Sequence, residues 1–317
     1  MVSLEDVEQA REVLSGVVRR TPLVPAEPGP GFPYKGVYLK LESLQVTGSF
    51  KIRGAYVKVR DVALSGKARG VVAFSAGNHG KGVAYAAALN GLESAIVMPE
   101  YAVRAKVEGV RYLGGEPVIS GSNSMETARK AQEIARDRGY VFVHPFNDPL
   151  VIAGQGTVGL EILEDLPDAT QVVVPVSGGG LLSGVALAIK AKRPSVRLVG
   201  VQPEGSNAMY RSLKEGRVVE LESVDTIADG LTAKRVERLT LDIVREYVDE
   251  IVLVSDEEIR LAARMMLTDL KVVSELSGAV GIAALISGKV SPSSGTVVVV
   301  SGSNVGGDQL LDLLRAG

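Results

Sequence analysis

Lys51 stands in an unusual setting for a charged side chain, because the segment around it, TGSFKIRGA (residues 47–55), consists mostly of small, apolar and hydroxyl-bearing residues. If Ser49 caps a helix that begins near Phe50, Lys51 lies in the first turn, where the helix dipole disfavours a positive charge. Apolar neighbours add a desolvation cost, and both effects lower the pKa of an amine. A partly neutral lysine is a nucleophile suited to Schiff-base formation with a carbonyl. The alternative is a surface lysine whose alkyl stem packs on the core, and the position of Lys51 in the sequence, taken alone, favours this alternative.

A run of three glycines provides a second candidate site. SGGGL, residues 177–181, follows the apolar run VVVPV. Consecutive glycines let successive backbone N–H groups point into one concavity, and a following helix adds its positive end, so the segment predicts a phosphate-binding turn. It lacks the Gly-Lys-Ser/Thr of a Walker loop and the GxGxxG pattern of dinucleotide sites. A phosphate without the rest of a nucleotide is the sharper interpretation, and a tightly packed turn between strand and helix is the alternative.

A Schiff-base lysine and a small phosphate cup together suggest pyridoxal 5′-phosphate (PLP), whose aldehyde and phosphate need these two features. Five segments in this order, TGSFKIRGA, SAGNHGKGVA, PVSGGGLLSG, TIADGL and SGSNVGG, resemble those of the fold-type II PLP enzymes. Within that group the chain is most similar to the branch of threonine/serine dehydratases (threonine ammonia-lyases) and serine racemases. Threonine synthases and cysteine synthases usually have Lys-Asp-Arg at the lysine, whereas this chain has Lys51, Ile52 and Arg53. The resemblance covers nearly the whole chain.

The resemblance implies a role for each matching residue. Lys51 would hold PLP as a Schiff base and then take the Cα proton of the substrate. Asn78 would hydrogen-bond the ring hydroxyl oxygen, and Ser301 would face the pyridine nitrogen with a neutral hydroxyl. The backbone amides that would bind the phosphate are those of Ser177, Gly178, Gly179, Gly180 and Leu181. Ser75, Asn78 and His79 would receive the substrate carboxylate, although His79 is equally well explained as a structural hydrogen-bonding group.

Four positions depart from the pattern of the family. Ala76 stands where racemase-like members tend to have a second serine, and because alanine has no proton to give, racemisation is not expected as a main activity. Gln202 and Ala208, in VQPEGSNAMY, occupy the apparent positions of acidic ligands for a divalent metal, so no such metal site is expected. Lys81 replaces the usual glutamine of SAGNHGQG, and the sequence explains neither this lysine nor Arg53.

The implied reaction is the PLP-dependent dehydration and deamination of L-threonine, and of L-serine as well, to 2-oxobutanoate or pyruvate and ammonia. Serine racemase and 3-hydroxyaspartate dehydratase are the enzymatic alternatives, and a PLP-binding protein without turnover is the non-catalytic one. The sequence has a complete loop for binding the substrate carboxylate in addition to Lys51. This argues against the non-catalytic alternative, because a protein that only holds PLP needs no substrate site. Residues 204–209 and Asp229 are expected to contact the β-substituent of the substrate.

The candidate residues lie between short β-branched runs and helical patterns that alternate along the chain, which is typical of an α/β fold with parallel sheets. We expect strands at residues 71–74, 95–98, 141–143, 172–176, 197–201, 251–254 and 296–300, and helices at 57–64, 81–89, 125–138, 182–192 and 257–271. Three strands run into small polar residues, SAGNHG, SGGGL and SGSNVGG, and then into a helix. Because ligands bind beyond the carboxyl ends of such strands, we expect the three turns to hold one ligand.

The resemblance also implies a domain organisation. It implies two open twisted parallel-sheet domains with the cofactor in the cleft between them, as in the tryptophan synthase β-like fold. The large PLP-binding domain would comprise residues 1–60 and 148–317, and a small mobile domain residues 61–147. No C-terminal regulatory domain is expected.

Composition excludes several other classes of protein. The formal net charge of −2 indicates neither a nucleic-acid partner nor an anionic membrane. The sequence has no cysteine, which excludes disulfides and thiolate metal sites, and only two histidines, which argues against a histidine-rich metal centre. The N-terminus lacks the pattern of a signal peptide, and the uncharged run 172–189 contains a proline and three consecutive glycines, so it is better interpreted as strand, turn and buried helix than as a membrane span. We therefore expect a cytoplasmic protein without a nucleic-acid or membrane partner. The resemblance implies a homo-oligomer, a dimer or tetramer, that acts on a small amino-acid substrate.

Overall fold

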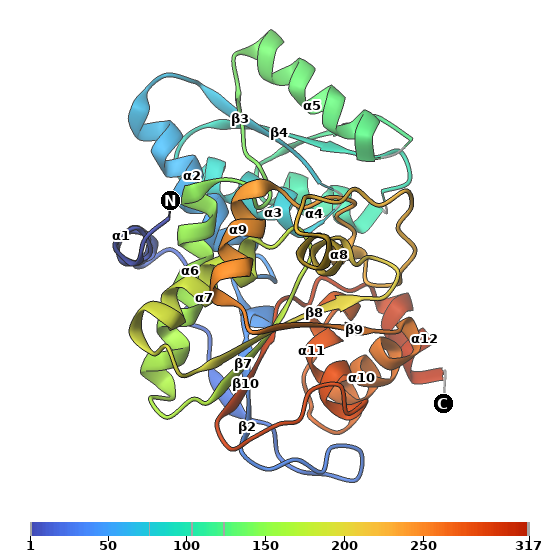
Figure 1. Cartoon of the computed structure of the whole chain (residues 1–317). Helices are drawn as coiled ribbons and strands as arrows, with labels where there is room; N and C mark the ends of the chain where they lie inside the picture. The colour runs from blue at the N-terminus through green and yellow to red at the C-terminus, as the bar shows by residue number, and fades with distance from the viewer. Residues whose placement is uncertain (1, 76, 103, 123, 316–317) are drawn as a thin grey trace.

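The computed structural model describes residues 2–75, 77–102, 104–122 and 124–315 of the chain. Its strands form two separate sheets, and in Figure 1 the four-stranded sheet, with β3 and β4, lies above the six-stranded sheet. The six-stranded sheet has the order β1-β2-β10-β7-β8-β9, with β1 (Leu23–Pro25), β2 (Val37–Leu41), β7 (Gln171–Pro175), β8 (Arg197–Pro203), β9 (Glu250–Val254) and β10 (Thr296–Val300). The four-stranded sheet has the order β5-β4-β3-β6, with β3 (Gly70–Phe74), β4 (Glu93–Met98), β5 (Glu116–Ile119) and β6 (Val141–Phe142).

Parallel pairing dominates both sheets, which confirms the expected α/β class. Among the strand pairs that the structure describes, β1 with β2 is antiparallel and the others are parallel. All the strands expected from the sequence are present, with small shifts at their ends. Strands β1, β2 and β5 were not expected. The sequence of β2, VYLKL, includes Lys40, whose side chain is fully buried, and a lysine in so short a run weakens the strand signal.

The helices pack around the two sheets. They are α1 (Leu4–Leu14), α2 (Lys51–Ser65), α3 (Asn78–Leu89), α4 (Arg104–Tyr112), α5 (Ser124–Arg138), α6 (Pro149–Asp165), α7 (Gly180–Lys192), α8 (Ala208–Glu215), α9 (Arg238–Tyr247), α10 (Asp256–Thr268), α11 (Leu276–Ile286) and α12 (Gly307–Arg315), with 3-10 turns η1 (Glu42–Leu44) and η2 (Asp229–Leu231). Each expected helix is present, although α10 ends at Thr268 and not at residue 271.

The start of helix α2 corrects one expectation. Lys51 is the first helical residue, but Ser49 does not cap the helix, because Phe50 occupies the N-cap position and no side chain caps it. Ser49 instead pairs through its backbone with Gly302, in the segment that follows β10. The N–H of Phe50 donates to the carbonyl oxygen of Ser301 across 3.1 Å, so the segment before α2 is held by the end of the central strand β10.

The uncharged run 172–189 forms β7, a turn and the buried helix α7, as the sequence predicts. Helices cover both faces of the six-stranded sheet, and alternate residues of each strand therefore enter different clusters. Val173 and Val298 pack in the cluster that contains α11, whereas Val172 and Val299 pack in the cluster that contains α7. Cover on both faces explains why β7 and β10 are buried at every position.

The four-stranded sheet is built entirely from the range 61–147, and the six-stranded sheet from the flanking ranges. Helix α2 crosses the expected boundary at residue 60, so the exact division into domains stays a prediction. None of the helices in the described part of the chain is long and apolar enough to cross a membrane.

Candidate active site

A cavity of about 700 Å³ opens at the carboxyl ends of strands from both sheets. Strand β3 ends at Phe74, β7 at Pro175 and β10 at Val300, and the turn after each of them contributes to its lining. The three turns that the sequence predicts to hold one ligand therefore meet at one cavity. Its lining includes every site residue predicted from the sequence: Lys51, Ser75, Asn78, His79, Ser177, Gly178, Gly179, Gly180, Leu181 and Ser301.

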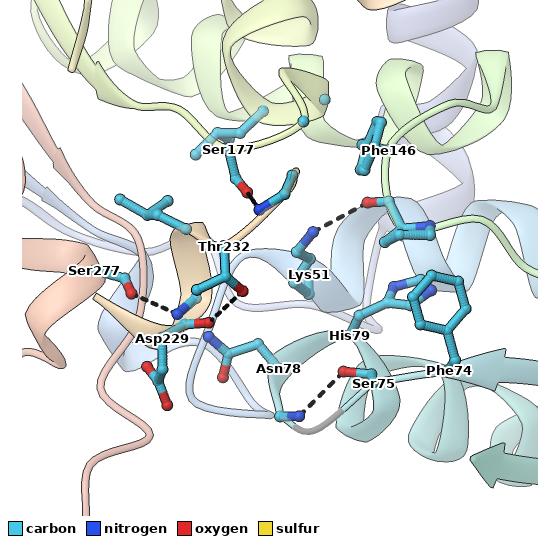
Figure 2. Close-up of a pocket in the computed structure, with 18 of the residues that line it drawn as sticks. Lys51, Phe74, Ser75, Asn78, His79, Phe146, Ser177, Asp229, Thr232 and Ser277 are labelled. Atoms are coloured by element: carbon cyan, nitrogen blue, oxygen red, sulfur yellow. Dashed lines mark hydrogen bonds between the residues drawn. The ribbon is translucent and has the colours of Figure 1, made fainter. Parts of the chain in front are cut away.

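Lys51 projects into the cavity from the first turn of α2 (Figure 2). Its Nζ donates a hydrogen bond to the carbonyl oxygen of Pro145 across 3.0 Å and lies 5.2 Å from the centroid of the Phe50 ring. Burial lowers the pKa of Lys51 from 10.5 to about 8, although the carboxylate of Glu275 opposes this shift. A fraction of the amine is therefore neutral near neutral pH, which is the form that attacks a carbonyl.

The glycine turn leads from β7 into α7. Gly179 has a φ of +95°, a conformation that favours glycine, and no side chain caps α7. A Cβ on Gly178 would lie 2.3 Å from the ring of Phe146, and a Cβ on Gly179 would lie 2.6 Å from Cε of Met209. Larger residues would thus clash in this turn. Because the first N–H groups of a helix lack partners within it, this helix end on the cavity wall suits a phosphate.

A loop of residues 228–233 is held against the glycine turn. The Ser177 hydroxyl accepts a hydrogen bond from the N–H of Ala233 across 3.2 Å. The Ser277 hydroxyl accepts one from the N–H of Gly230 across 2.8 Å, and Figure 2 shows both bonds. These two bonds attach the loop to the end of β7 and to α11.

The loop carries one of the two segments expected to contact the β-substituent of a substrate. Asp229 lines the cavity and accepts a hydrogen bond from Nζ of Lys106 across 2.5 Å, so an ion pair links the loop to α4. Residues 204–209 do not belong to the lining that the structure describes, which corrects that part of the expectation. The segment lies behind the glycine turn, where Met209 packs against Gly179.

The turn after β3 provides another wall. The Ser75 hydroxyl accepts a hydrogen bond from the N–H of Gly77 across 3.1 Å (Figure 2). Asn78 is the first residue of α3, and its N-cap Gly77 has no side chain with which to cap the helix. Because the first N–H groups of a helix lack partners within it, this helix end suits the carboxylate of a substrate. Ala76 lies outside the described residues.

His79 has a structural hydrogen bond in addition to its place in the lining. Its Nε2 lies 2.9 Å from the carbonyl oxygen of Val143. Burial, with a smaller contribution from the nearby Lys51 cation, lowers the pKa of His79 to about 3. The ring is therefore neutral at physiological pH, and Nε2 carries the proton because a carbonyl oxygen can only accept. This bond ties α3 to the segment after β6.

Ser301 lies directly after β10 and is buried against the cavity. Its carbonyl oxygen accepts the N–H of Phe50, so the residue that precedes Lys51 is fixed to the residue proposed to face the pyridine nitrogen. A neutral hydroxyl at this place suits an unprotonated ring nitrogen, as the resemblance implies.

Sequence reasoning missed several polar residues of the site, among them Glu275 and Asn304. Glu275, just before α11, accepts a hydrogen bond from Nδ2 of Asn78 across 2.6 Å. Burial and the repulsion of Asp229 raise the pKa of Glu275 from 4.5 to about 7. Nδ2 of Asn304 donates to Oδ1 of Asn78, also across 2.6 Å. Asn304 lies inside the quoted segment SGSNVGG, but nothing in the sequence distinguishes Glu275 from a surface residue before a helix.

Arg53, which the sequence left unexplained, is the centre of a buried ion cluster. Its guanidinium is fully buried and binds the carboxylate of Glu42 through Nε and Nη2, each across 2.8 Å. It also binds the carboxylate of Glu161 across 2.7 and 2.9 Å. Lys40 joins the cluster across 2.7 Å to Glu161. Lys51 and Arg53 both lie in the first turn of α2. The cluster therefore fixes this turn against η1, β2 and α6, which carry the other charged residues of the cluster.

The residues present fit PLP. A partly neutral lysine amine lies in the same cavity as a glycine turn that a Cβ would fill, and the uncapped start of α7 provides N–H donors for a phosphate. Gln202 and Ala208 stand at the positions where some members of the family have acidic ligands for a divalent metal, and the structure shows what these two residues do instead. Oε1 of Gln202 accepts the N–H of Tyr210 across 2.9 Å, and Ala208 is fully buried at the start of α8.

Comparison with known proteins adds independent observations. The family model described as "Pyridoxal-phosphate dependent enzyme" matches residues 14–302. The L-threonine ammonia-lyase of Thermotoga maritima is 47% identical over 305 residues, which cover 96% of this chain and 76% of the relative. The catabolic L-threonine dehydratase of Escherichia coli (strain K12) is 42% identical over 308 residues, which cover 96% of this chain and 93% of the relative.

Solved structures resemble the fold closely. Maize serine racemase matches with a TM-score of 0.92 and 36% sequence identity, covering 99% of this chain and 97% of that one. Threonine deaminase isoform 2 from Solanum lycopersicum, in its processed form, matches with a TM-score of 0.89 and 34% identity, covering 98% of this chain and 93% of that one.

Proposed function

The chain belongs to the family of pyridoxal-phosphate dependent enzymes, and from this premise we propose that it converts L-threonine to 2-oxobutanoate and ammonia, and L-serine to pyruvate and ammonia. The observation that carries the proposal is the position of Lys51, a buried amine in one cavity with the glycine turn and the start of α3. The choice of substrate is supported by relatives at 47% and 42% identity that are named for activity on L-threonine.

Bound PLP supplies an electron sink for the electron pair left when the substrate loses its Cα proton. Lys51 provides both the attachment point and the base. Its nitrogen would be the group that accepts the Cα proton of the substrate. The hydrogen bond to Pro145 holds the lysine side chain in the cavity while it carries that proton.

The substrate carboxylate binds at the start of α3 in this proposal. The hydroxyl of Ser75 and the uncapped N–H groups that begin with Asn78 supply its donors. His79 contributes by fixing α3 to Val143, because its Nε2 proton is already used. The amides of residues 177–181 would hold the phosphate of PLP, and the hydroxyl of Ser301 would face the pyridine nitrogen; all of these residues line the cavity.

The reaction balances without an external oxidant. Lys51 would remove the Cα proton, the β carbon–oxygen bond would break, and the hydroxyl would leave as water with a proton that balances the one taken by Lys51, so that the lysine returns to its neutral form. The released enamine takes a proton on carbon to become an imine, which water hydrolyses to the keto acid and ammonia. One water is lost and one is taken up, so L-threonine yields 2-oxobutanoate and ammonia.

Serine racemase is a second candidate because of the likeness to the maize enzyme at a TM-score of 0.92. Racemisation needs a proton donor on the face of Cα opposite Lys51. Ala76 stands where racemase-like members tend to have a serine, and alanine has no hydroxyl that could donate such a proton, which favours elimination over racemisation. The Ala76→Ser variant is expected to raise racemase activity.

The test is a substrate panel for the purified PLP-loaded protein. Ammonia and keto-acid release are measured with L-threonine, L-serine, both D-enantiomers and 3-hydroxyaspartate. The proposal predicts the highest kcat/KM for L-threonine, followed by L-serine. A clear preference for 3-hydroxyaspartate, or interconversion of serine enantiomers faster than keto-acid release, would contradict it.

We also propose that the enzyme acts in the cytoplasm as a homo-oligomer. Exposed leucines on the packed helices α10 and α12, namely Leu261, Leu311 and Leu314, are each about half exposed and support an interface there. Light scattering with size-exclusion chromatography tests this, and a monomer at micromolar concentration would contradict it.

A further inference from the structure

Lys81, the lysine that the sequence left unexplained, begins a row of hydrogen bonds that ends at the cavity. Its Nζ donates to Oδ1 of Asn304 across 2.8 Å. Nδ2 of Asn304 donates to Oδ1 of Asn78, and Nδ2 of Asn78 donates to Glu275, each across 2.6 Å. We call these four residues the Lys81–Glu275 network.

The chemistry of the groups gives the network one direction. A lysine ammonium can only donate, so the end of Asn304 that faces Lys81 must be its oxygen. The amide nitrogen of Asn304 then faces two acceptors, Oδ1 of Asn78 and the carbonyl oxygen of Thr47, the latter across 2.9 Å. Asn78 must therefore turn its own nitrogen toward Glu275. That nitrogen carries two hydrogens, and the bond to Glu275 uses one of them.

Glycines leave the space that the network occupies. A Cβ on Gly109 of α4 would lie 2.8 Å from Cε of Lys81, and a Cβ on Gly48 would lie 2.7 Å from Oδ1 of Asn304. A Cβ on Gly302 would lie 2.7 Å from Oε1 of Glu275. A side chain at any of these three positions would displace a member of the network.

The network also joins the two sheets. Asn78 and Lys81 lie on α3, which follows β3 of the four-stranded sheet, whereas Asn304 follows β10 of the six-stranded sheet. Lys81 is partly buried, and no ion pair of its own is described. Its ammonium donates a hydrogen bond to the side-chain amide of Asn304, and Asn304 in turn donates one to Asn78.

We propose that Lys81 is a positioning residue, which acts through Asn304 to hold the side-chain amide of Asn78 with its nitrogen toward the cavity and to fix α3 against the end of β10. The inference rests on the proposed function, in which Asn78 donates to the ring hydroxyl oxygen of PLP. A stable donor at that oxygen favours its ionised form, and loss of the donor favours the neutral form. The two forms differ in visible absorbance, so the effect has a readout other than activity.

The test compares absorbance spectra and kinetics of the PLP-loaded wild type and Lys81→Met, which keeps the length of the side chain and removes the ammonium. We expect the ratio of the visible to the near-ultraviolet PLP band to fall about fivefold, and kcat for L-threonine to fall about tenfold with KM changed by less than about threefold. Lys81→Arg, which can still donate to Asn304, restores most of both values. Lys190→Met is the matched control, because Lys190 is also partly buried and also donates a hydrogen bond, in its case to the carboxylate of Asp249, but it takes no part in the network.

A double-mutant cycle tests whether the residues act as one unit. If Lys81 acts through Asn304, the double variant Lys81→Met, Asn304→Ala loses no more of the visible band than Asn304→Ala alone. Additive losses would overturn the inference, as would an unchanged spectrum and kcat in Lys81→Met when the wild type takes up PLP normally. A wild type that takes up no PLP would instead overturn the proposed function, and the inference with it.

Gly109→Ala provides a test that leaves all four residues of the network in place. Alanine favours the helix, so the variant should unfold at no lower urea concentration than the wild type. Its Cβ pushes the end of Lys81 aside, and we expect the same change in the spectrum to a smaller extent. If the variant folds normally and its spectrum matches the wild type, the inference is contradicted even where Lys81→Met fails to fold.

Discussion

Nζ of Lys51 donates a hydrogen bond across 3.0 Å to the carbonyl oxygen of Pro145, a residue 94 positions further along the chain. A neutral carbonyl oxygen accepts the hydrogen bond but stabilises the ammonium charge less than a carboxylate at that distance does. The contact therefore holds the amine in place and leaves burial free to lower its pKa to about 8. The orientation and the reactivity of Lys51 thus have separate causes.

The pH dependence of PLP uptake follows from this pKa. Only the neutral amine attacks the aldehyde, and the neutral fraction falls about tenfold for each pH unit below the pKa. The rate at which the PLP-free protein takes up PLP should rise with pH and level off above about 8. Stopped-flow absorbance across this range measures it. A rate that continues to rise tenfold per unit toward the ordinary lysine value of 10.5 would show that burial does not tune Lys51.

Arg53 should matter more for folding than for chemistry. Removing its guanidinium leaves the carboxylates of Glu42 and Glu161 buried without their main partner. We expect Arg53→Met to lower the free energy of unfolding by about 3–5 kcal/mol, measured by urea denaturation. Arg53→Lys should recover only part of the loss, because an ammonium cannot bind two carboxylates in the bidentate manner of the guanidinium.

The control for Arg53 is Arg238→Met. Arg238 also pairs with a carboxylate, Asp242, but its side chain is 71% exposed. Its loss should lower the free energy of unfolding by about 0.5 kcal/mol or less. Equal losses in Arg53→Met and Arg238→Met would contradict the assignment of Arg53 to a buried structural cluster.

Local chemistry made part of the site predictable from the sequence. The glycine turn and the three strand-to-helix turns carry their signal within a few residues, and the parallel fold follows from alternating patterns. The partners of Arg53 are 11 and 108 positions away, so the sequence does not reveal that its charge is buried. Serine is a common N-cap residue, but the backbone of Ser49 pairs with Gly302 and Phe50 occupies the N-cap position of α2. Glu275 lines the cavity and contacts Asn78 although the two residues are 197 positions apart in the sequence.

The glycine turn gives a prediction about cofactor affinity. In Gly179→Ala the new Cβ meets Cε of Met209 at 2.6 Å, and alanine is strained at a φ of +95°. The Met209 methyl can move away, but alanine is strained at this φ and its Cβ would also lie 3.1 Å from Cβ of Thr240, so we expect the turn to shift and PLP to bind at least about tenfold more weakly. Fluorescence titration of the PLP-free protein measures the Kd.

Gly216→Ala is the matched control for Gly179→Ala. Gly216 also has a positive φ, +71°, but no atom lies within 4 Å of the Cβ that alanine would add. The variant should lose about 1 kcal/mol of stability through backbone strain and keep the Kd for PLP. A similar Kd in both glycine variants would show that the Gly179 turn does not bind the phosphate.

The ion pair between Lys106 and Asp229 predicts how the enzyme discriminates between substrates. Asp229 neutralises a cation of the cavity wall that would otherwise attract a second carboxylate on the substrate. We expect Asp229→Asn to raise kcat/KM for 3-hydroxyaspartate relative to L-threonine by about tenfold. The double variant Asp229→Asn, Lys106→Gln should lose this gain. No change in the ratio would mean that the β-substituent does not reach the ion pair.

The most direct test of the central claim is the rate at which the PLP-loaded protein releases 2-oxobutanoate from L-threonine, compared between the wild type and Lys51→Ala with PLP in excess. If Lys51 removes the Cα proton, the variant should lose at least about a thousandfold in kcat while it still folds and unfolds as the wild type does. A Lys51→Ala variant that keeps a tenth or more of the wild-type rate would contradict the account.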